Sequence, residues 1–210
     1  MDFLFPHTCR ICGATGTVAC DACLTQLQPP KPFQYPWITS GWNYHDPSVE
    51  KIIRHLKHHP DEPLIKTLIT YLGLTRWSND SSPRELLISE ETFEKPMVIP
   101  IPLHISRMRE RGYNQAEIIA RHYASFWEFV LMTQVLIKKR KTKKQGTSAS
   151  RDERFDNVTD AFAVTHEHLI KDRIVILVDD VCTTGATLCE ARACLLRSGA
   201  REVWAFTLAN

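Results

Sequence analysis

The sequence lacks the features of a membrane or secreted protein. No apolar run approaches the roughly 18 residues that a membrane-spanning helix needs. The first seven residues have neither the basic start nor the long apolar stretch of a secretory signal. We therefore expect a cytoplasmic protein with no integral membrane segment, which would reach the inner face of the membrane only through partners.

A large net charge is also missing. With a formal charge of +2 over 210 residues, whole-protein electrostatics indicate no partner, so any preference for anions must come from local clusters. The apolar content of 43% is ordinary for a globular protein and excludes wholesale disorder. The length suits one sizeable α/β core with a small appendage.

Four of the seven cysteines form two close pairs near the N-terminus, Cys9-x-x-Cys12 and Cys20-x-x-Cys23. Four thiolates at this spacing predict a closed tetrahedral zinc site, which is structural because no position stays open for water. A redox role for either pair is the alternative, but no strand and helix surround them. So short a knuckle has few apolar residues, and we expect metal binding to supply its folding energy.

Hydrophobic patterns predict an α/β protein with a parallel sheet. Helices are expected over 46–58, 64–74, 114–129 and 187–197. Strands are expected over 37–44, 97–102, 135–137, 174–178 and 202–208, and the last two flank a helix as in a βαβ unit. The expected organisation is a zinc knuckle (1–30), a connector with a hood or helical segment (31–95) and a core (96–210). Residues 78–95 and 138–154 are expected as loops.

The segment Asp179–Thr187 follows an apolar strand and opens a helix, which is where open α/β sheets bind ligands. Unpaired backbone N–H groups at a helix start suit a phosphate, and Gly185 would let the backbone approach it. Three hydroxyls could donate further hydrogen bonds, those of Thr183, Thr184 and Thr187. The alternative is that these residues only cap a helix.

Two adjacent carboxylates, Asp179 and Asp180, stand at the exit of this strand. As ionised groups they only accept hydrogen bonds, so they could accept hydrogen bonds from vicinal sugar hydroxyls or bind a divalent cation through water. The alternative is that they simply end the strand.

This segment resembles the signature of type I phosphoribosyltransferases. The resemblance implies a parallel sheet flanked by helices, and a site for phosphoribosyl pyrophosphate with Mg²⁺. Asp179 and Asp180 would be the catalytic pair that holds the ribose hydroxyls. The 5-phosphate cradle would consist of Thr183, Thr184, Gly185, Ala186 and Thr187. Some proteins of this fold bind without catalysing, so the resemblance indicates fold more specifically than activity.

A second motif carries three arginines on the chain that follows the strand at 97–102. The guanidinium group of arginine can donate two parallel hydrogen bonds to two phosphate oxygens. Arg107, Arg111 and the turn residue Gly112 are therefore candidates for binding pyrophosphate. Asn114 can cap the helix that follows. The alternative is a solvated basic helix start.

This motif, Pro-Ile-Pro-Leu-His at 100–104 with Arg-x-x-x-Arg-Gly-Tyr-Asn-Gln-Ala-Glu at 107–117, resembles the ComF family of competence-associated proteins. The basic run at 140–145, the chain end at 199–209 and the cysteine knuckle extend the resemblance over nearly the whole length. A polar run at 146–148 replaces the usual leucine there. The resemblance implies a role in natural transformation, with single-stranded DNA and a DNA-uptake helicase or recombination-loading protein as partners.

The basic segment 138–154 holds eight lysines and arginines against two acids. It could close over a polyphosphate as a lid, follow a nucleic-acid backbone, or be only a solvated loop. The candidate nucleic-acid contacts are Lys138, Lys139, Arg140, Lys141, Lys143 and Lys144. Exposed aromatic residues would stack bases, and we expect Trp37, Trp42 and Tyr44 to do so.

Two functions of different classes follow. The first is a ComF-like protein that handles incoming single-stranded DNA through a fold that binds phosphoribosyl pyrophosphate. The second is an active phosphoribosyltransferase without direct DNA contact, acting on an unidentified nucleobase or nucleotide-like acceptor that a hood at 37–44 would select. No residue of the sequence specifies the acceptor.

Overall fold

The computed structural model describes residues 7–75, 94–139 and 161–210 of the chain. A parallel sheet in the order β1-β7-β6-β2-β3 forms its centre. Its strands are β1 (Ile38–Trp42), β2 (Met97–Pro100), β3 (Val130–Leu131), β6 (Ile174–Val181) and β7 (Glu202–Ala209). A separate antiparallel pair consists of β4 (Leu136–Lys138) and β5 (Phe162–Val164). The helices are α1 (Asp21–Leu24), α2 (Pro47–His58), α3 (Glu62–Thr75), α5 (Ile105–Arg111), α6 (Gln115–Trp127), α8 (Glu167–Ile170) and α9 (Ala186–Arg197).

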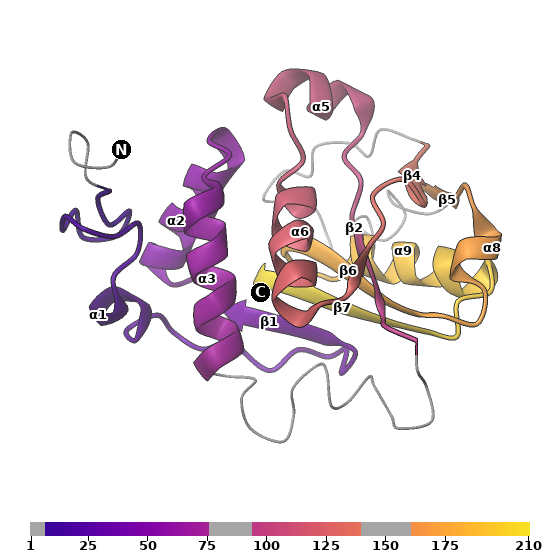
Figure 1. Ribbon diagram of the computed structural model, residues 1–210, viewed down its shortest axis with the longest axis horizontal. Coiled ribbons are helices and arrows are strands. Elements are labelled where there is room, and N and C mark those ends of the chain that lie inside the picture. Colours follow the sequence, from indigo (N-terminus) through magenta and orange to yellow (C-terminus); the bar gives the residue numbers. More distant parts are fainter. Residues whose placement is uncertain (1–6, 76–93, 140–160) are drawn as a thin grey trace.

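The central strand β6 is buried on both faces, as its apolar sequence predicts. Because side chains alternate along a strand, Ile174, Ile176 and Val178 join the core beneath α2, α3 and α6. Val175 and Leu177 join the core on the opposite face, where α9 packs. Figure 1 shows the sheet between these helices. The predicted parallel α/β sheet flanked by helices is therefore confirmed.

The predicted helix boundaries largely hold because the capping residues are local. The side chain of Asp46 accepts hydrogen bonds from the backbone N–H of Ser48 and Val49, which starts α2. The helix ends at His58, two residues before Pro60. The βαβ unit formed by β6, α9 and β7 is also confirmed.

The segment expected as a connector contributes an edge strand to the sheet. Strand β1 pairs in parallel with β7, and the buried hydroxyls of Ser40 and Thr207 lie 2.8 Å apart in a hydrogen bond. The expectation that Trp42 is exposed is wrong. Its side chain is 2% exposed because it points into the core and stacks on Tyr71, with 6.4 Å between ring centroids.

Two segments for which no helix or strand was predicted contain ordered elements. The arginine-rich segment after β2 forms the short helix α5, with His104 as its N-cap. The first residue of the expected basic loop, Lys138, lies in β4, which pairs with β5. The remainder of that loop from residue 140, and the other polar loop up to residue 93, lie outside the described residues. Among the helices that are described, none combines the length and the apolar character needed to cross a membrane.

Candidate functional site

A polar cavity of about 330 Å³ lies at the carboxyl ends of the neighbouring strands β2 and β6. These ends lie side by side, since Pro100 is in register with Val178 and the Ile101 N–H donates to the Val178 carbonyl at 2.8 Å. The cavity wall brings together residues predicted from separate motifs, namely Arg107, Arg111, Lys138, Asp179, Asp180, Thr183 and Thr187.

The two carboxylates at the end of β6 face this cavity in adjoining positions. Burial, and then the charge of Asp180, raise the pKa of Asp179 well above its ordinary value. On the side of Asp180, Lys57 Nζ from α2 lies 3.9 Å from Oδ2. A ligand that brings hydroxyl donors or a cation would relieve the repulsion between the two acids.

Lys138 belongs to the cavity instead of to a loop. Its Nζ lies 5.2 Å from the centroid of the Phe162 ring, on the neighbouring strand β5. Burial and the charge of Arg107 lower the pKa of Lys138, whereas Asp179 acts in the opposite direction. The strand pairing β4–β5 fixes this lysine toward the carboxylates, and sequence polarity alone did not reveal that pairing.

The threonine loop forms a second, small cavity of about 40 Å³ that shares Asp179, Thr183 and Thr187 with the first. Its backbone turns through Gly185, which has a φ of 81° and precedes the first residue of α9. A Cβ at Gly185 would lie 2.8 Å from Cε2 of Tyr35. Both the left-handed backbone and the packing of Tyr35 therefore require a glycine at this position.

The residues between α5 and α6 tie three elements together. Gly112 ends α5 with a φ of 78°, and its N–H donates to the Met108 carbonyl at 2.8 Å. The Tyr113 hydroxyl donates to the Leu56 carbonyl at 2.8 Å, which fixes the end of α2, next to Lys57, against the cavity.

Asn114 and Gln115 complete this connection. Asn114 Oδ1 accepts from the Ala116 N–H at 3.1 Å, the predicted cap, and Nδ2 donates to the Ile101 carbonyl at 3.0 Å. Arg111 donates to the Gln115 side-chain oxygen at 3.1 Å. The sequence motif therefore encodes the geometry of the cavity wall as well as its charge.

Not every predicted residue reaches the cavity. Gly112 and Lys139 are exposed and do not line it. Four predicted contacts lie outside the described residues, namely Arg140, Lys141, Lys143 and Lys144. Three further residues line the wall. Tyr44 was expected only to stack bases or to belong to the hood, and the sequence assigned no ligand contact to Lys57 or Gln115, because their place depends on the tertiary fold.

The charge balance of the cavity favours an anion. Among the described residues, four cationic side chains line it, from Lys57, Arg107, Arg111 and Lys138, against the carboxyl groups of Asp179 and Asp180. Carboxylate oxygens are ligands that Mg²⁺ accepts in proteins, usually together with substrate phosphates. The donor set therefore fits a polyphosphate accompanied by Mg²⁺.

The predicted cysteine knuckle has the geometry of a metal site. The four Sγ atoms of Cys9, Cys12, Cys20 and Cys23 lie within 4.8 Å of one another, and those of Cys12 and Cys20 are 3.8 Å apart. Tetrahedral zinc with bonds of about 2.3 Å requires sulfur atoms about 3.8 Å apart. Burial opposes ionisation of Cys9, but backbone N–H donors, including those of Cys12 and Cys20, lower its pKa to about 6. This cluster can hold a metal ion.

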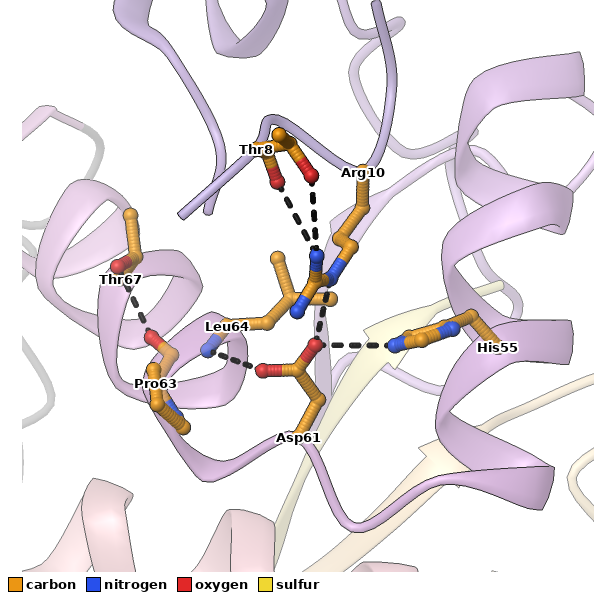
Figure 2. Close-up of polar contacts among 7 residues, drawn as sticks. All are labelled: Thr8, Arg10, His55, Asp61, Pro63, Leu64 and Thr67. Atoms are coloured by element: carbon orange, nitrogen blue, oxygen red, sulfur yellow. Dashed lines mark hydrogen bonds and ion pairs between the residues drawn. The ribbon is translucent and has the colours of Figure 1, made fainter. Parts of the chain in front are cut away.

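Figure 2 shows how the knuckle is attached to the rest of the protein. Arg10, from the first cysteine pair, donates through Nε to Asp61 Oδ2 at 2.8 Å, and His55 Nε2 contacts the same oxygen at 2.9 Å. Asp61 Oδ1 accepts from the Leu64 N–H in the first turn of α3. Burial alone would raise the pKa of Asp61, but these hydrogen bonds outweigh it and hold the pKa below its ordinary value.

Comparison with known proteins agrees with the fold. Residues 109–210 match the phosphoribosyl transferase domain family. The chain is 32% identical to competence protein F of Haemophilus influenzae over 114 residues, and 35% identical to competence protein ComFC of Bacillus subtilis over 113 residues. The chain is therefore similar to competence proteins F and ComFC, and its C-terminal part matches the phosphoribosyl transferase domain. Its predicted type I phosphoribosyltransferase fold is thereby confirmed.

The extent of similarity differs among the relatives. The alignment with competence protein F covers 54% of this chain and 49% of that protein, and the alignment with ComFC covers 53% and 43%. The chain thus spans about half of the length of these two. DNA utilization protein YhgH of Escherichia coli O157:H7 is 27% identical over 201 residues, 93% of this chain and 82% of that protein.

The attachment of the knuckle predicts a pH-dependent stability. Asp61→Asn should lower the free energy of unfolding at pH 7 by about 1–3 kcal/mol, because Arg10 loses a charged acceptor. A depressed pKa stabilises the fold above the unfolded value of about 3.9, and this contribution disappears as the pH falls through the lower folded value. Urea unfolding from pH 7 to pH 3.5 should show the difference from the unsubstituted protein shrink below about pH 4.

The matched control is Glu50→Gln, which breaks an ion pair with Arg54 on the exposed side of α2. It should change stability by less than about 0.5 kcal/mol. Equal stability of Asp61→Asn and the unsubstituted protein at every pH would contradict the role assigned to this network.

The cysteine cluster predicts one zinc ion per chain. Replacing Cys12 and Cys23 by Ser should remove the zinc and lower the thermal midpoint, because metal binding stabilises only the folded knuckle. Elemental analysis and thermal unfolding with and without a chelator measure both effects. Cys189→Ser, a cysteine on α9 outside the cluster, should keep the zinc. The site would be refuted if the unsubstituted protein, folded and prepared with excess zinc, contained no bound zinc.

Proposed function

We propose that this protein binds phosphoribosyl pyrophosphate with Mg²⁺ in the cavity at the ends of β2 and β6, and that it acts in natural transformation on incoming single-stranded DNA. The observation that supports the ligand best is the meeting of two vicinal carboxylates, a threonine loop at a helix start and two arginines around one space. Phosphoribosyl pyrophosphate has one matching group for each: ribose hydroxyls for the carboxylates, a 5-phosphate for the threonine loop and a diphosphate for the arginines.

In this proposal the ribose hydroxyls donate to the carboxylates of Asp179 and Asp180 at the end of β6. The 5-phosphate lies at the start of α9, where unpaired backbone N–H groups favour an anion. The cradle at this point consists of Thr183, Thr184, Gly185, Ala186 and Thr187. The arrangement follows the family resemblance and places each ligand group against its complementary charge.

The pyrophosphate would face Arg107 and Arg111 on α5. Their guanidinium groups match phosphate oxygens in a planar, bidentate manner. Mg²⁺ would be held through the carboxylates and the phosphate oxygens, and when bound it would neutralise part of the negative charge of the pyrophosphate. Lys57 and Lys138 contribute further positive charge on either side of the carboxylates.

Catalytic turnover is the alternative function. Transfer would break the bond between the sugar C1 and the pyrophosphate oxygen while a bond forms from C1 to the acceptor. Pyrophosphate leaves with the bonding electrons, and cations preorganised at Arg107 and Arg111 would stabilise that charge. Tyr44, which follows β1 and lines the cavity, is the part of the predicted hood that lies where an acceptor would enter.

The role in DNA handling is supported by the relatives. Their names refer to competence and to DNA utilization, and two of them match about half of this chain while the third matches most of it. The basic segment from residue 138 offers the positive charge that single-stranded DNA needs. The helicase or recombination-loading partner suggested by the resemblance remains part of this proposal, as does a cytoplasmic location.

Replacing both Asp179 and Asp180 by Asn should weaken the binding of phosphoribosyl pyrophosphate at least roughly hundredfold, since two charged acceptors are lost. Single-stranded DNA binding should be unchanged or stronger. Calorimetric titration with Mg²⁺ present measures the first effect, and fluorescence anisotropy with a labelled oligonucleotide measures the second. Unaltered affinity for phosphoribosyl pyrophosphate would refute the assigned site, and pyrophosphate release with a tested acceptor would establish turnover.

Reversing the charge of the basic segment tests the contact with DNA. Replacement of Arg140, Lys141, Lys143 and Lys144 by Glu should weaken single-stranded DNA binding and reduce its salt slope by up to about 3, since each phosphate contact contributes about 0.7. Lys138 is left unchanged because it lines the cavity. The matched control reverses four exposed positions elsewhere, Lys31, Lys66, Lys171 and Arg201. An equal loss in both variants would contradict a specific contact through this segment.

A further inference from the structure

Gln115, the first residue of α6, has a buried side chain that is only half satisfied. The residue is among those that line the ligand cavity, and it is 2% exposed. Its amide nitrogen has no hydrogen-bond partner among the described residues. A buried donor left unpaired has lost its hydration without a replacement, so a partner that arrives with a ligand would compensate this loss.

The orientation of the amide follows from its neighbour. Arg111 contacts the other end of the amide at 3.1 Å, and a guanidinium group can only donate hydrogen bonds. The atom facing Arg111 must therefore be the oxygen, and the atom without a partner is the NH₂ group with its two donors. Gln115 thus fixes Arg111 with one end and offers donors at the other.

The surroundings identify the class of acceptor. The NH₂ group lies beside a guanidinium group and at the start of a 13-residue helix, and both favour negative charge. The carboxylates at the end of β6 and the threonine loop are contributed by other elements of the cavity. The acceptor is therefore an anionic phosphate oxygen on the part of the ligand that Arg111 contacts.

We infer that Gln115 binds the ligand directly, donating from its NH₂ group to a diphosphate oxygen while its amide oxygen positions Arg111. This inference rests on the proposed binding of phosphoribosyl pyrophosphate and adds a residue that discriminates the diphosphate from the sugar phosphate. A neutral amide suits this task because it adds a donor without adding negative charge beside the phosphates.

A double-mutant cycle separates direct contact from positioning. The variants are Gln115→Met, Arg111→Met and both together, titrated in a calorimeter with phosphoribosyl pyrophosphate, inorganic pyrophosphate and ribose 5-phosphate, each with Mg²⁺. Gln115→Met should lower the affinity for phosphoribosyl pyrophosphate and for pyrophosphate roughly tenfold or more, as expected for the loss of a hydrogen bond to a charged group. Its affinity for ribose 5-phosphate should change less than about twofold. In the Arg111→Met background, Gln115→Met should still lower the affinity for phosphoribosyl pyrophosphate.

Each contrary result has its own meaning. If Gln115→Met has no further effect in the Arg111→Met background, Gln115 only positions the arginine and direct binding is refuted. If Gln115→Met leaves the affinity for pyrophosphate unchanged in both backgrounds, the inference fails while the proposed function stands. If the unsubstituted protein binds neither phosphoribosyl pyrophosphate nor pyrophosphate, the proposed function fails first and the inference with it.

Two further variants guard against a loss of folding. Gln115→Glu keeps the size of the side chain and an acceptor for Arg111 but has no donor, so it should also weaken pyrophosphate binding. Gln134→Met changes an exposed glutamine between β3 and β4 and should leave all three affinities unchanged. Normal pyrophosphate affinity in Gln115→Glu would overturn the assigned donor.

Discussion

The two hydrogen bonds of the Asn114 side chain hold the ligand cavity together. One reaches the Ile101 carbonyl just beyond β2, and the other caps α6 at Ala116, so the short arginine helix α5 is looped out between two fixed ends. Asn114 is buried, and removal of either bond would leave an unpaired polar group in the interior. The place of the arginines, and hence the electrostatic character of the site, depends on this residue.

The cavity balances buried acids against surrounding cations. Asp179 resists ionisation because it is buried and adjoins Asp180, while Lys57 and Lys138 approach from two separate elements. Such a site gains most from a ligand that brings both hydroxyl donors and phosphate groups, because each then meets its complement. The phosphoribosyl transferase domain match and the proposed ligand are consistent with this balance.

The helix α2 links the cysteine knuckle to the same cavity. Near its end, His55 shares the Asp61 carboxylate with Arg10 of the knuckle, and Lys57 reaches Asp180 on the other side. Tyr113 holds the Leu56 carbonyl between them. A metal site that folds the knuckle therefore also supports the element that carries Lys57, although none of the described knuckle residues 7–30 lines the cavity.

The sequence by itself determined the elements whose signals are local. The apolar run of β6, the caps at Asp46 and Asn114, the paired cysteines and the threonine loop all act within a few residues, so their patterns predicted their structure. Only the tertiary structure decided that β1 joins the sheet, that Trp42 is buried and that Lys138 faces the cavity. Those outcomes depend on strand pairing and packing between residues far apart in the chain, which no local pattern encodes.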